Sequence, residues 1–506
     1  MTSVQNIPKA GRREWTGLAV IALPCLVYAM DLTVLNLALP AISTDLAPSA
    51  AEMLWIIDIY PLLTAGLLVP MGTLADRVGN RRVLLTGLVV FGIASLLAAF
   101  AQTPAMLIGA RVLLALGGSM IVPCVLGIIR RTFEDEDERA MALGLWGTVG
   151  AAGAAVGPLI GGGLLEHFWW GSVFLINVPI VLVVASLVFL LLPRTETTTP
   201  GHWALGQALL LIAGTISIVY GIKTGVGATQ PLVITVLVLT LGLSLLTIFV
   251  RQQVRSSAPM LDLSLFSRPA ILAGMIMAVV TTGALAGVEL TLAQELQYVL
   301  GRPPLQAGIF MIPIMAAAAV GGPVAGYLSN RFGLRLVASL SLEVAAAALA
   351  FLALADFRNP GFLVPTMLAL LGLTLSTGLT ASSIAIMGSV EASKGGEAGS
   401  LEATGYELGT GLGITFFGVF MSSVFSRSIS LPSDLAQPLA ERAARSIGDS
   451  YVVAQELTEP QAAAVIEAAK AAFSATHSTL LMTSAGLIGC LGVLVFIMLR
   501  DYRDRN

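Results

Sequence analysis

The chain has 506 residues, of which 56% are hydrophobic and only 11% are charged, and its formal net charge at pH 7 is -3. Soluble globular domains carry about 25% charged residues, so this composition excludes a soluble domain and indicates a protein that crosses a membrane several times. The three cysteines, Cys25, Cys124 and Cys490, lie in apolar runs and predict neither a disulfide framework nor a metal site.

Apolar runs long enough to span a bilayer as a helix, about twenty residues, recur along the whole chain. Fourteen such runs cover residues 16–38, 54–74, 82–100, 104–128, 140–164, 170–192, 203–222, 231–250, 270–296, 305–329, 335–355, 361–390, 400–424 and 478–499. The first run is too long for a signal-peptide core, and no small-residue cleavage site follows it, so we expect it to be retained. The predicted fold is an all-α integral membrane protein with fourteen transmembrane helices.

The charges between these runs predict the topology. An even number of helices places both termini on one side of the membrane. If that side is the cytoplasm, the inner segments hold about nineteen Lys and Arg residues against about seven in the outer segments, as the positive-inside rule requires. Lys223 is counted among the outer charges, whereas Arg111 remains inside a helix. We therefore predict a multi-pass protein of the cell inner (cytoplasmic) membrane with both termini cytoplasmic.

A weak internal repeat suggests how the helices are grouped. GTLADRVGNRR (72–82) joins helices 2 and 3, GYLSNRFGLR (326–335) joins helices 10 and 11, and both fit G-x-L-x-x-R-x-G-x-R. Repeated halves with a binding site at their interface are the usual architecture of transporters. The predicted division is a cytoplasmic N-terminus (1–14), an N-terminal bundle of helices 1–6 (15–194), two inserted helices 7–8 (195–256), a C-terminal bundle of helices 9–14 (257–499) and a cytoplasmic C-terminus (500–506).

The longest loop, residues 425–477, is predicted to lie outside between helices 13 and 14. In TEPQAAAVIEAAKAAF, Thr458 can cap a helix, Pro460 suits the first helical position, and Gln461 completes a capping box. We expect an extracytoplasmic helical hairpin here. The three histidines, His167, His202 and His477, fall at predicted helix ends or in loops and are interpreted as interfacial polar residues.

The loop that joins helices 2 and 3 resembles the signature loop of the major facilitator superfamily. In that family the loop latches two six-helix halves in the outward-facing state, and the alternative is a plain positive-inside turn. The resemblance implies that the glycines permit a tight turn, that the aspartate pairs with an arginine or with helix amides, and that the arginines hold the turn in the cytoplasm. These residues are Gly72, Asp76, Arg77, Gly79, Arg81 and Arg82. The second copy of the loop has Asn330 in place of Asp76.

Helix 5 is similar to the antiporter motif of the same superfamily, G-x-x-x-G-P-x-x-G-G. The matching residues are Gly153, Gly157, Pro158, Gly161 and Gly162. Small residues at this spacing let helices approach closely. The resemblance implies a packing surface between the halves and export rather than uptake, with Gly321, Gly322 and Pro323 of helix 10 as the expected partner. A generic contact between small residues is the alternative.

Ionisable side chains inside the apolar runs are the candidates for substrate and proton binding, because a charge in hydrocarbon is costly. Those that we single out are Asp31, Asp58, Glu289, Glu402, Glu407 and Arg111. Five residues turn a helix by about 140°, so Glu402 and Glu407 do not share a face, and Glu407 is the deeper of the two. Glu295 points about 240° away from Glu289, close to the outer interface. Arg111 cannot shed its proton, so it needs a carboxylate, backbone carbonyls or water.

MDLTVLNLALP (30–40) resembles the helix 1 motif of the fourteen-helix drug/proton antiporter branch of the superfamily. Nearly the whole chain is similar to SmvA-type efflux pumps for methyl viologen and quaternary ammonium compounds, which are related to QacA-type pumps. The resemblance implies that Asp31 carries protons or binds cations and that Arg111 is tied to proton coupling. QacA-type pumps carry an acidic residue in helix 10 that this chain lacks, and Glu289 in helix 9 is the expected substitute.

The predicted function is a proton-coupled multidrug antiporter that confers biocide resistance. Its expected substrates are lipophilic organic cations, including quaternary ammonium compounds, viologen-like dications and cationic dyes. An isolated buried carboxylate can hold either a proton or a cation, so the two would compete at Asp31 or Glu407. A proton-coupled symporter for a small nutrient is the alternative. No P-loop, HExxH motif or histidine cluster occurs, so we expect no enzyme, cofactor or metal. The expected partners are protons and the lipid bilayer, without nucleic acid, and we expect a monomer.

Overall fold

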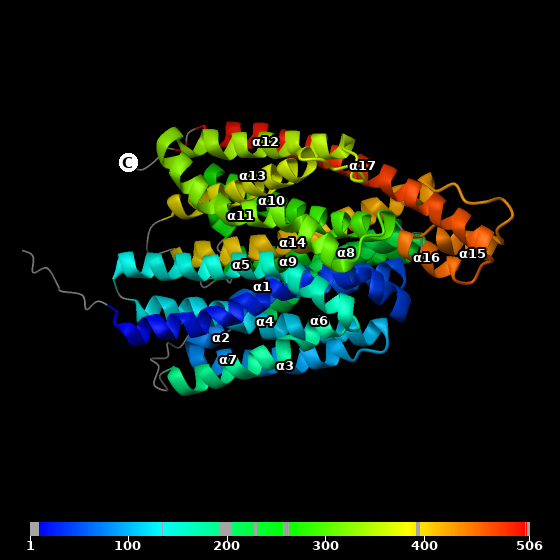
Figure 1. Cartoon of the computed structure of the whole chain (residues 1–506). Coiled ribbons are helices and arrows are strands. Elements are labelled where there is room, and N and C mark those ends of the chain that lie inside the picture. The colour runs from blue at the N-terminus through cyan, green and yellow to red at the C-terminus, as the bar shows by residue number, and fades with distance from the viewer. Residues whose placement is uncertain are drawn as a thin grey trace, which may run out of the picture.

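The computed structural model describes residues 10–133, 135–192, 205–226, 230–256, 259, 261, 263–390, 395–500 and 502. Lys9, Arg194, Lys394, Arg503 and Arg505, which contribute to the predicted charge asymmetry, lie outside these residues, as does the junction 193–204. Every regular element within them is a helix (Figure 1): α1 (Arg12–Leu46), α2 (Ala50–Val78), α3 (Asn80–Ala99), α4 (Pro104–Thr132), α5 (Glu136–His167), α6 (Ser172–Leu175), α7 (Asn177–Leu191), α8 (Leu205–Val226), α9 (Leu232–Arg255), η1 (Leu263–Ser267), α10 (Pro269–Gln294), η2 (Glu295–Val299), α11 (Pro304–Phe332), α12 (Leu334–Leu354), α13 (Leu363–Gly388), α14 (Gly395–Ser428), α15 (Gln437–Ala443), α16 (Ile447–Ala454) and α17 (Glu459–Met498).

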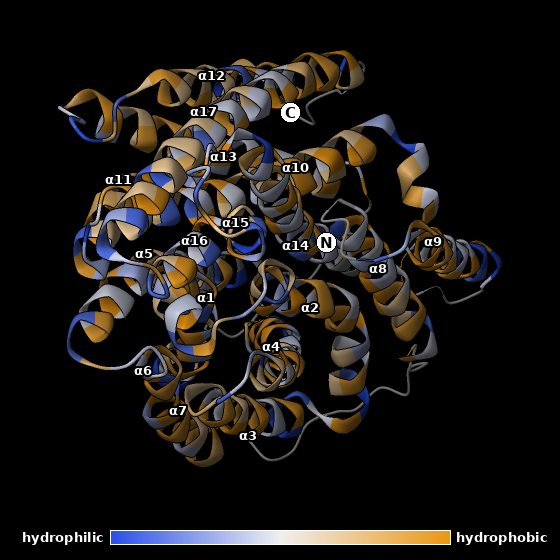
Figure 2. Ribbon diagram, turned by 90° about the vertical axis from the view of Figure 1, so that its right-hand side faces the viewer, coloured by the Kyte–Doolittle hydropathy of each residue, from blue (hydrophilic) through white to orange (hydrophobic). Residues whose placement is uncertain are grey.

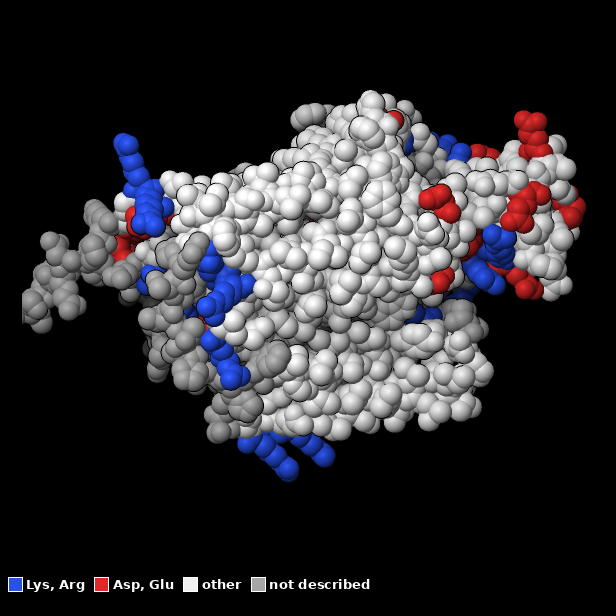
Figure 3. All heavy atoms as spheres, turned by 90° about the horizontal axis from the view of Figure 1, so that it is seen from below, with Lys and Arg blue, Asp and Glu red and all other residues white. Residues whose placement is uncertain are grey.

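Fourteen helical spans among the described residues are long and apolar enough to cross a membrane, which confirms the predicted number. The short α6 and α7 together make one of these spans, and α10 with η2 makes another. Lys, Arg, Asp and Glu gather at the two ends of the molecule, and the face seen in Figure 3 carries almost no charge between them. Large side chains such as Leu232 and Leu237 on α9 are more than half exposed on this belt. The protein is therefore a multi-pass membrane protein.

The helices form two packed groups. One hydrophobic core is built mainly by α1 to α7, and another mainly by α10 to α17. The pair α8 and α9 lies beside the two groups (Figure 2), and α8 contacts both α2 and α14. Between the groups, α2 packs against α14 and α5 packs against α11. These two contacts hold the groups together along the middle of the molecule.

The two repeated loops have the same backbone geometry. Gly79 between α2 and α3 has φ of 105°, and Gly333 between α11 and α12 has φ of 84°. Each N–H closes the end of the preceding helix, Gly79 on the carbonyl of Ala75 at 2.8 Å and Gly333 on that of Ser329 at 2.9 Å. Only glycine adopts this region without strain, which explains why both copies have glycine at the turn.

The long loop before the last membrane span forms the predicted helical structure, but the predicted start of that span is wrong. The helices α15 and α16 are followed by α17, one continuous helix of 40 residues that starts in the loop and crosses the membrane. The stretch that starts at Glu459 is rich in Ala and has no helix breaker after Pro460, so nothing ends the helix at the predicted boundary of residue 478. The predicted capping box does not form: Thr458 is the N-cap, but its hydroxyl bonds to the side chain of Gln461 at 3.2 Å. The interpretation of His477 as an interfacial residue is also wrong, because it lies inside α17 and is 2% exposed.

Candidate functional site

Asp31 on α1 is not the isolated carboxylate that the sequence suggested. Its Oδ2 lies 2.8 Å from Nη1 of Arg111 on α4, and both side chains are 1% exposed. Its Oδ1 accepts a hydrogen bond of 3.1 Å from Asn177 on α7. Arg111 also donates from Nε to the carbonyl of Ile56 at 3.0 Å. Its guanidinium therefore has a carboxylate and a backbone carbonyl as partners, two of the three kinds that the sequence predicted. This ion pair is closed within the first group of helices.

Asp58 on α2 also has a basic partner, Lys223. The predicted position of this lysine is wrong. Lys223 was counted as a charge of an outer loop, but it lies near the end of α8 and is 5% exposed. Its Nζ lies 2.6 Å from Oδ2 of Asp58 and 4.0 Å from the centre of the Trp55 ring. Thr415 on α14 donates to the same oxygen at 2.8 Å. One buried cluster thus joins α2, α8 and α14.

Glu407 on α14 differs from both aspartates because it has no basic partner among the described residues. Its Oε1 accepts a hydrogen bond of 2.6 Å from the hydroxyl of Tyr28 on α1, across the two groups of helices. Its Oε2 is buried and has no hydrogen-bond partner. A buried carboxylate with a free oxygen is costly to keep charged, so the site favours an incoming proton or cation.

Aromatic rings connect the Glu407 site to the Asp31 pair. The ring of Tyr28 lies 5.8 Å from that of Tyr60 on α2, centre to centre. The guanidinium of Arg111 lies over the other ring of this pair, 4.6 Å from the centre of Tyr60. The row Asp31, Arg111, Tyr60, Tyr28 and Glu407 therefore runs through adjoining contacts from α1 and α4 to α14.

The remaining predicted carboxylates face different surroundings. Glu289 on α10 is 9% exposed and makes no hydrogen bond or ion pair with the residues that the structure describes. Glu402 accepts a hydrogen bond from the hydroxyl of Tyr406, one turn further along the same helix, and this bond does not involve Glu407. Glu295 contacts α17, away from Glu289, as the helical geometry predicted. The structure thus brings Asp31, Arg111 and Glu407 into one row and leaves the other carboxylates separate.

The predicted latch loop makes its contacts inside the first group of helices. Asp76 pairs with Arg131 at the end of α4, at 3.1 Å, and both side chains are substantially exposed. Arg81 donates to the carbonyl of Phe189 at 2.6 Å and lies over its ring, which fastens the start of α3 to the end of α7. Arg77 and Arg82 lie on either side of the turn at Gly79, and both are exposed. Gly72 is not part of the turn: it lies inside α2, where a Cβ would be 3.4 Å from Cβ of Pro123 on α4.

The glycine motif of α5 packs against two helices. A Cβ on Gly153 would lie 2.6 Å from the carbonyl oxygen of Leu26 on α1, and one on Gly162 would lie 2.6 Å from the Cα of Leu305 on α11. Gly157 and Gly161 also face α1, whereas Pro158 touches Gly308 of α11. The motif therefore lies between the groups, as its resemblance implied.

The predicted partner helix of this motif is confirmed, because α11 packs against α5. The predicted partner residues are wrong, because Gly321 packs against Ser376 of α13 and Gly322 faces Thr380. Those glycines lie more than a helix turn beyond Gly308, so they meet a different neighbour.

A narrow cavity of about 90 Å³ lies where the outer ends of the groups meet. Leu39 and Leu54 line it from one group, Leu290 and Thr291 from the other, and Gly448 of α16 covers it.

Tyr28, Lys223, Asn177 and Thr415 belong to the site but were absent from the predicted set. For Lys223, the apolar character of residues 205–226 on both sides was the signal that could have placed it inside a helix. Tyr28 lies three residues, nearly one helical turn, before Asp31, so its face was also accessible to prediction. Nothing local in the sequence marks Asn177 or Thr415.

Comparison with known proteins is consistent with this architecture. Residues 21–414 match the model of the Major Facilitator Superfamily. The methyl viologen resistance protein SmvA of Salmonella typhimurium (strain 14028s / SGSC 2262) is 45% identical over 97% of this chain and 100% of its own length. The multidrug efflux pump LfrA of Mycolicibacterium smegmatis is 35% identical over 99% of each chain. A bacterial homologue of the human lysosomal transporter Spinster, in an inward-facing and occupied conformation, shares the fold with a TM-score of 0.70, 17% identity, and coverage of 97% of this chain and 98% of its own.

Proposed function

Because the chain belongs to the major facilitator superfamily, a family of membrane transporters and not of enzymes, we propose that it is a proton-coupled antiporter that exports lipophilic organic cations. The observation that carries the proposal is the environment of Glu407. Its carboxylate has one free oxygen, no basic partner among the described residues, and a tyrosine pair beside it. A carboxylate next to aromatic faces is the arrangement that attracts organic cations.

Exchange follows from the unpaired carboxylate oxygen of Glu407. A proton or a cation can neutralise the carboxylate, but each excludes the other. Tyr28 reaches this carboxylate from the opposite group of helices, so a ligand that displaces its hydroxyl also breaks a bond between the groups. Loss of that bond favours a change in how the two groups pack against each other. In the changed packing the site would open to the other side of the membrane and release the ligand there.

The Asp31 pair has a different part in this mechanism. Arg111 already supplies its counter-charge, and a guanidinium cannot be neutralised by losing a proton. A substrate cation would have to displace a buried arginine to reach Asp31. We therefore assign the substrate cation to Glu407 and place Asp31 at the far end of the row, where it holds Arg111 against Tyr60.

The membrane potential favours exchange over simple export. Moving one positive charge outward costs about 2.3 kcal/mol per 100 mV of inside-negative potential. When a proton enters for each monovalent cation that leaves, no net charge moves. The names of SmvA and LfrA refer to methyl viologen resistance and multidrug efflux, and they support this direction and substrate class.

Transport into inverted membrane vesicles tests the proposal. With an acidic lumen, we expect uptake of a quaternary ammonium dye that stops when a protonophore removes the pH gradient. Glu407→Gln should abolish the uptake, whereas Asp434→Asn, at an exposed carboxylate in the loop before α15, should leave it unchanged. Uptake that needs protons to move in the same direction as the dye would instead establish a symporter.

We also propose that the chain lies in the inner membrane with both termini in the cytoplasm, because the basic end of the molecule satisfies the positive-inside rule. In a Cys490→Ser background, cysteine at Ser433 should react with an impermeant thiol reagent outside cells whose outer membrane, where there is one, has been permeabilised. Cysteine at Gln252 should react only after lysis. The opposite pattern would reverse the topology.

A further inference from the structure

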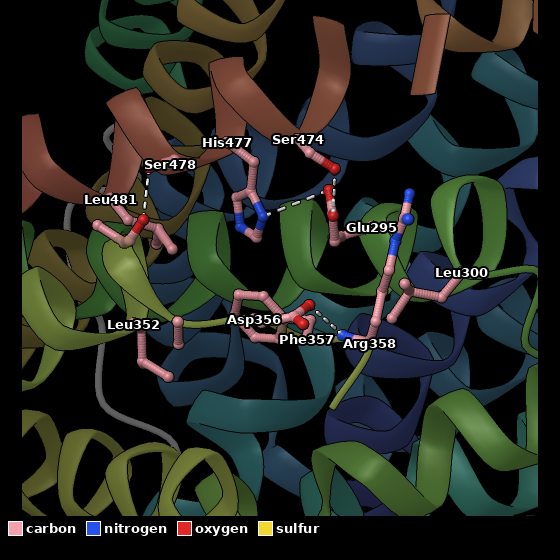
Figure 4. Close-up of a pocket in the computed structure, with 12 residues that line it drawn as sticks. Glu295, Leu300, Leu352, Asp356, Phe357, Arg358, Ser474, His477, Ser478 and Leu481 are labelled. Carbon is pink, nitrogen blue, oxygen red and sulfur yellow. Dashed lines mark hydrogen bonds and ion pairs between the residues drawn. The ribbon is translucent and has the colours of Figure 1, made fainter. Parts of the chain in front are cut away.

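A cavity of about 340 Å³ lies within the second group of helices, apart from the row that ends at Glu407. It is enclosed by η2, the outer end of α12, the turn 355–358 and α17 (Figure 4). All of its lining residues belong to this one group, so it is not part of the path between the two groups. Its volume is in the range of small-ligand pockets, about 300–1,000 Å³.

Two buried side chains that line this cavity each have a polar atom without a hydrogen-bond partner. Glu295 is 4% exposed, and its Oε1 accepts a hydrogen bond of 2.6 Å from Ser474. Its Oε2 lies 3.6 Å from Nδ1 of His477, too far for a good hydrogen bond. Oε2 of Glu295 and Nε2 of His477, which is 2% exposed, have no hydrogen-bond partner. Such atoms are costly to bury, so the cavity lacks a group that would satisfy them.

The chemistry of these two atoms indicates which ligand group would bind them. The nearby carboxylate favours the imidazole proton on Nδ1 of His477, which leaves Nε2 as an acceptor. Both unpartnered atoms then accept hydrogen bonds, and one of them carries negative charge. A primary ammonium group has three N–H donors and a positive charge, whereas a quaternary ammonium group has no N–H to donate. The ring of Phe357, stacked 5.9 Å from that of His477, provides an apolar wall for a short carbon chain.

We propose that this cavity is a second binding site, specific for a primary ammonium group that Glu295 and His477 hold. The local backbone supports a binding role, because η2 is a π-helical turn that starts at Glu295. Single π-helical turns within α-helices are frequent at functional sites. The site differs from that of Glu407 in its demand for N–H donors.

The mouth of the cavity suggests two sources for this group. Arg358 is exposed in the lining turn, and its backbone N–H donates to Asp356 at 2.9 Å. Leu354 and Phe362, on either side of the turn, are 80% and 86% exposed, which places the mouth at the edge of the apolar belt. The ammonium can thus belong to a free short-chain amine, or to the headgroup of an aminophospholipid whose phosphate meets Arg358.

Binding to the delipidated full-length protein in detergent tests the site. Butylammonium chloride and tetramethylammonium chloride are compared by thermal stabilisation at equal ionic strength. We expect butylammonium to bind at least tenfold more tightly, and Glu295→Gln to weaken it at least tenfold. Glu467→Gln, a matched change on the exposed part of α17, should have no effect. His477→Phe keeps the ring but removes Nε2, and it should also weaken butylammonium, which provides a second test if Glu295→Gln does not fold.

Native mass spectrometry of protein from mixed-lipid nanodiscs distinguishes the sources. Retention of phosphatidylethanolamine over phosphatidylcholine that disappears in Glu295→Gln would assign the site to a lipid headgroup. Butylammonium binding without such retention would assign it to a free amine. Equal binding of the two ammonium salts, binding that survives both substitutions, or no binding of butylammonium or phosphatidylethanolamine would overturn the proposal. Because Glu407 is absent from this cavity, none of these outcomes depends on the proposed antiport.

Discussion

The intramembrane carboxylates of the two groups of helices differ in their partners. In the first group, Asp31 and Asp58 each have a buried cation, Arg111 and Lys223. In the second group, neither Glu289 nor Glu407 has a basic partner among the described residues. The charge of a paired carboxylate is balanced by its basic partner, whereas an unpaired carboxylate needs a proton or a bound cation to balance its charge. The first group is thus suited to holding structure, and the second to exchanging ligands.

Removing Asp31 should test this difference most strongly. Asp31→Asn leaves Arg111 buried without a counter-charge, and breaking a buried pair typically costs about 3–5 kcal/mol. We expect a large fall in the melting temperature of the purified protein, whereas Glu407→Gln should change stability by less than about 1 kcal/mol because it leaves no buried charge behind. Similar melting temperatures for the two variants would remove the distinction between the groups.

Removing Lys223 should also lower the melting temperature, and a second substitution at Asp58 should restore most of it. Lys223→Met leaves Asp58 unpaired and is expected to cost about 3–5 kcal/mol, because α8 supplies its only cation among the described residues. The double variant Asp58→Asn with Lys223→Met removes both charges and should recover most of the lost melting temperature. A double variant as unstable as Lys223→Met alone would mean that the lysine acts through packing on Trp55 rather than through its charge.

Glu407→Gln should leave a stable protein that has lost exchange. Binding of a monovalent dye to the parent protein in detergent should release protons, because the cation replaces the proton on Glu407. The variant should release none. Tyr28→Phe is a milder control: it keeps the ring but removes the hydrogen bond that the dye has to displace, worth about 0.5–1.5 kcal/mol net, so dye binding should tighten severalfold while proton release persists. Unchanged proton release by Glu407→Gln would move the exchange site to Glu289.

The smallest effect is expected at the exposed pair of the latch loop. Asp76 and Arg131 are both accessible to solvent, and such pairs contribute about 0–1 kcal/mol. Asp76→Asn should therefore leave insertion and melting temperature nearly unchanged and lower the rate of dye transport severalfold. Glu441→Gln, at an exposed carboxylate on α15, is the matched control. A normal transport rate in Asp76→Asn would reduce the loop to a signal for topology.

The sequence by itself determined the number and approximate limits of the spanning helices, because each apolar run has the length that a bilayer requires. It also identified the turn glycines Gly79 and Gly333, whose positive φ is a local property of the backbone. Glu289 and Glu295 could be assigned to different faces for the same reason, since the angle between residues of one helix is fixed. The start of α17 was the main error, because a helix has no local signal to end it where it leaves the membrane.

Only the tertiary structure decided which ionisable groups are paired. Arg111 is 80 residues from Asp31 in the chain, and Tyr28 is 379 residues from Glu407. Hydropathy indicates that a segment is a helix, but the rotation and crossing of helices decide which faces meet, and these depend on packing along their whole length. The sequence therefore supplied the carboxylates, and the arrangement of α1, α4, α8 and α14 determined which of them have a basic partner among the described residues.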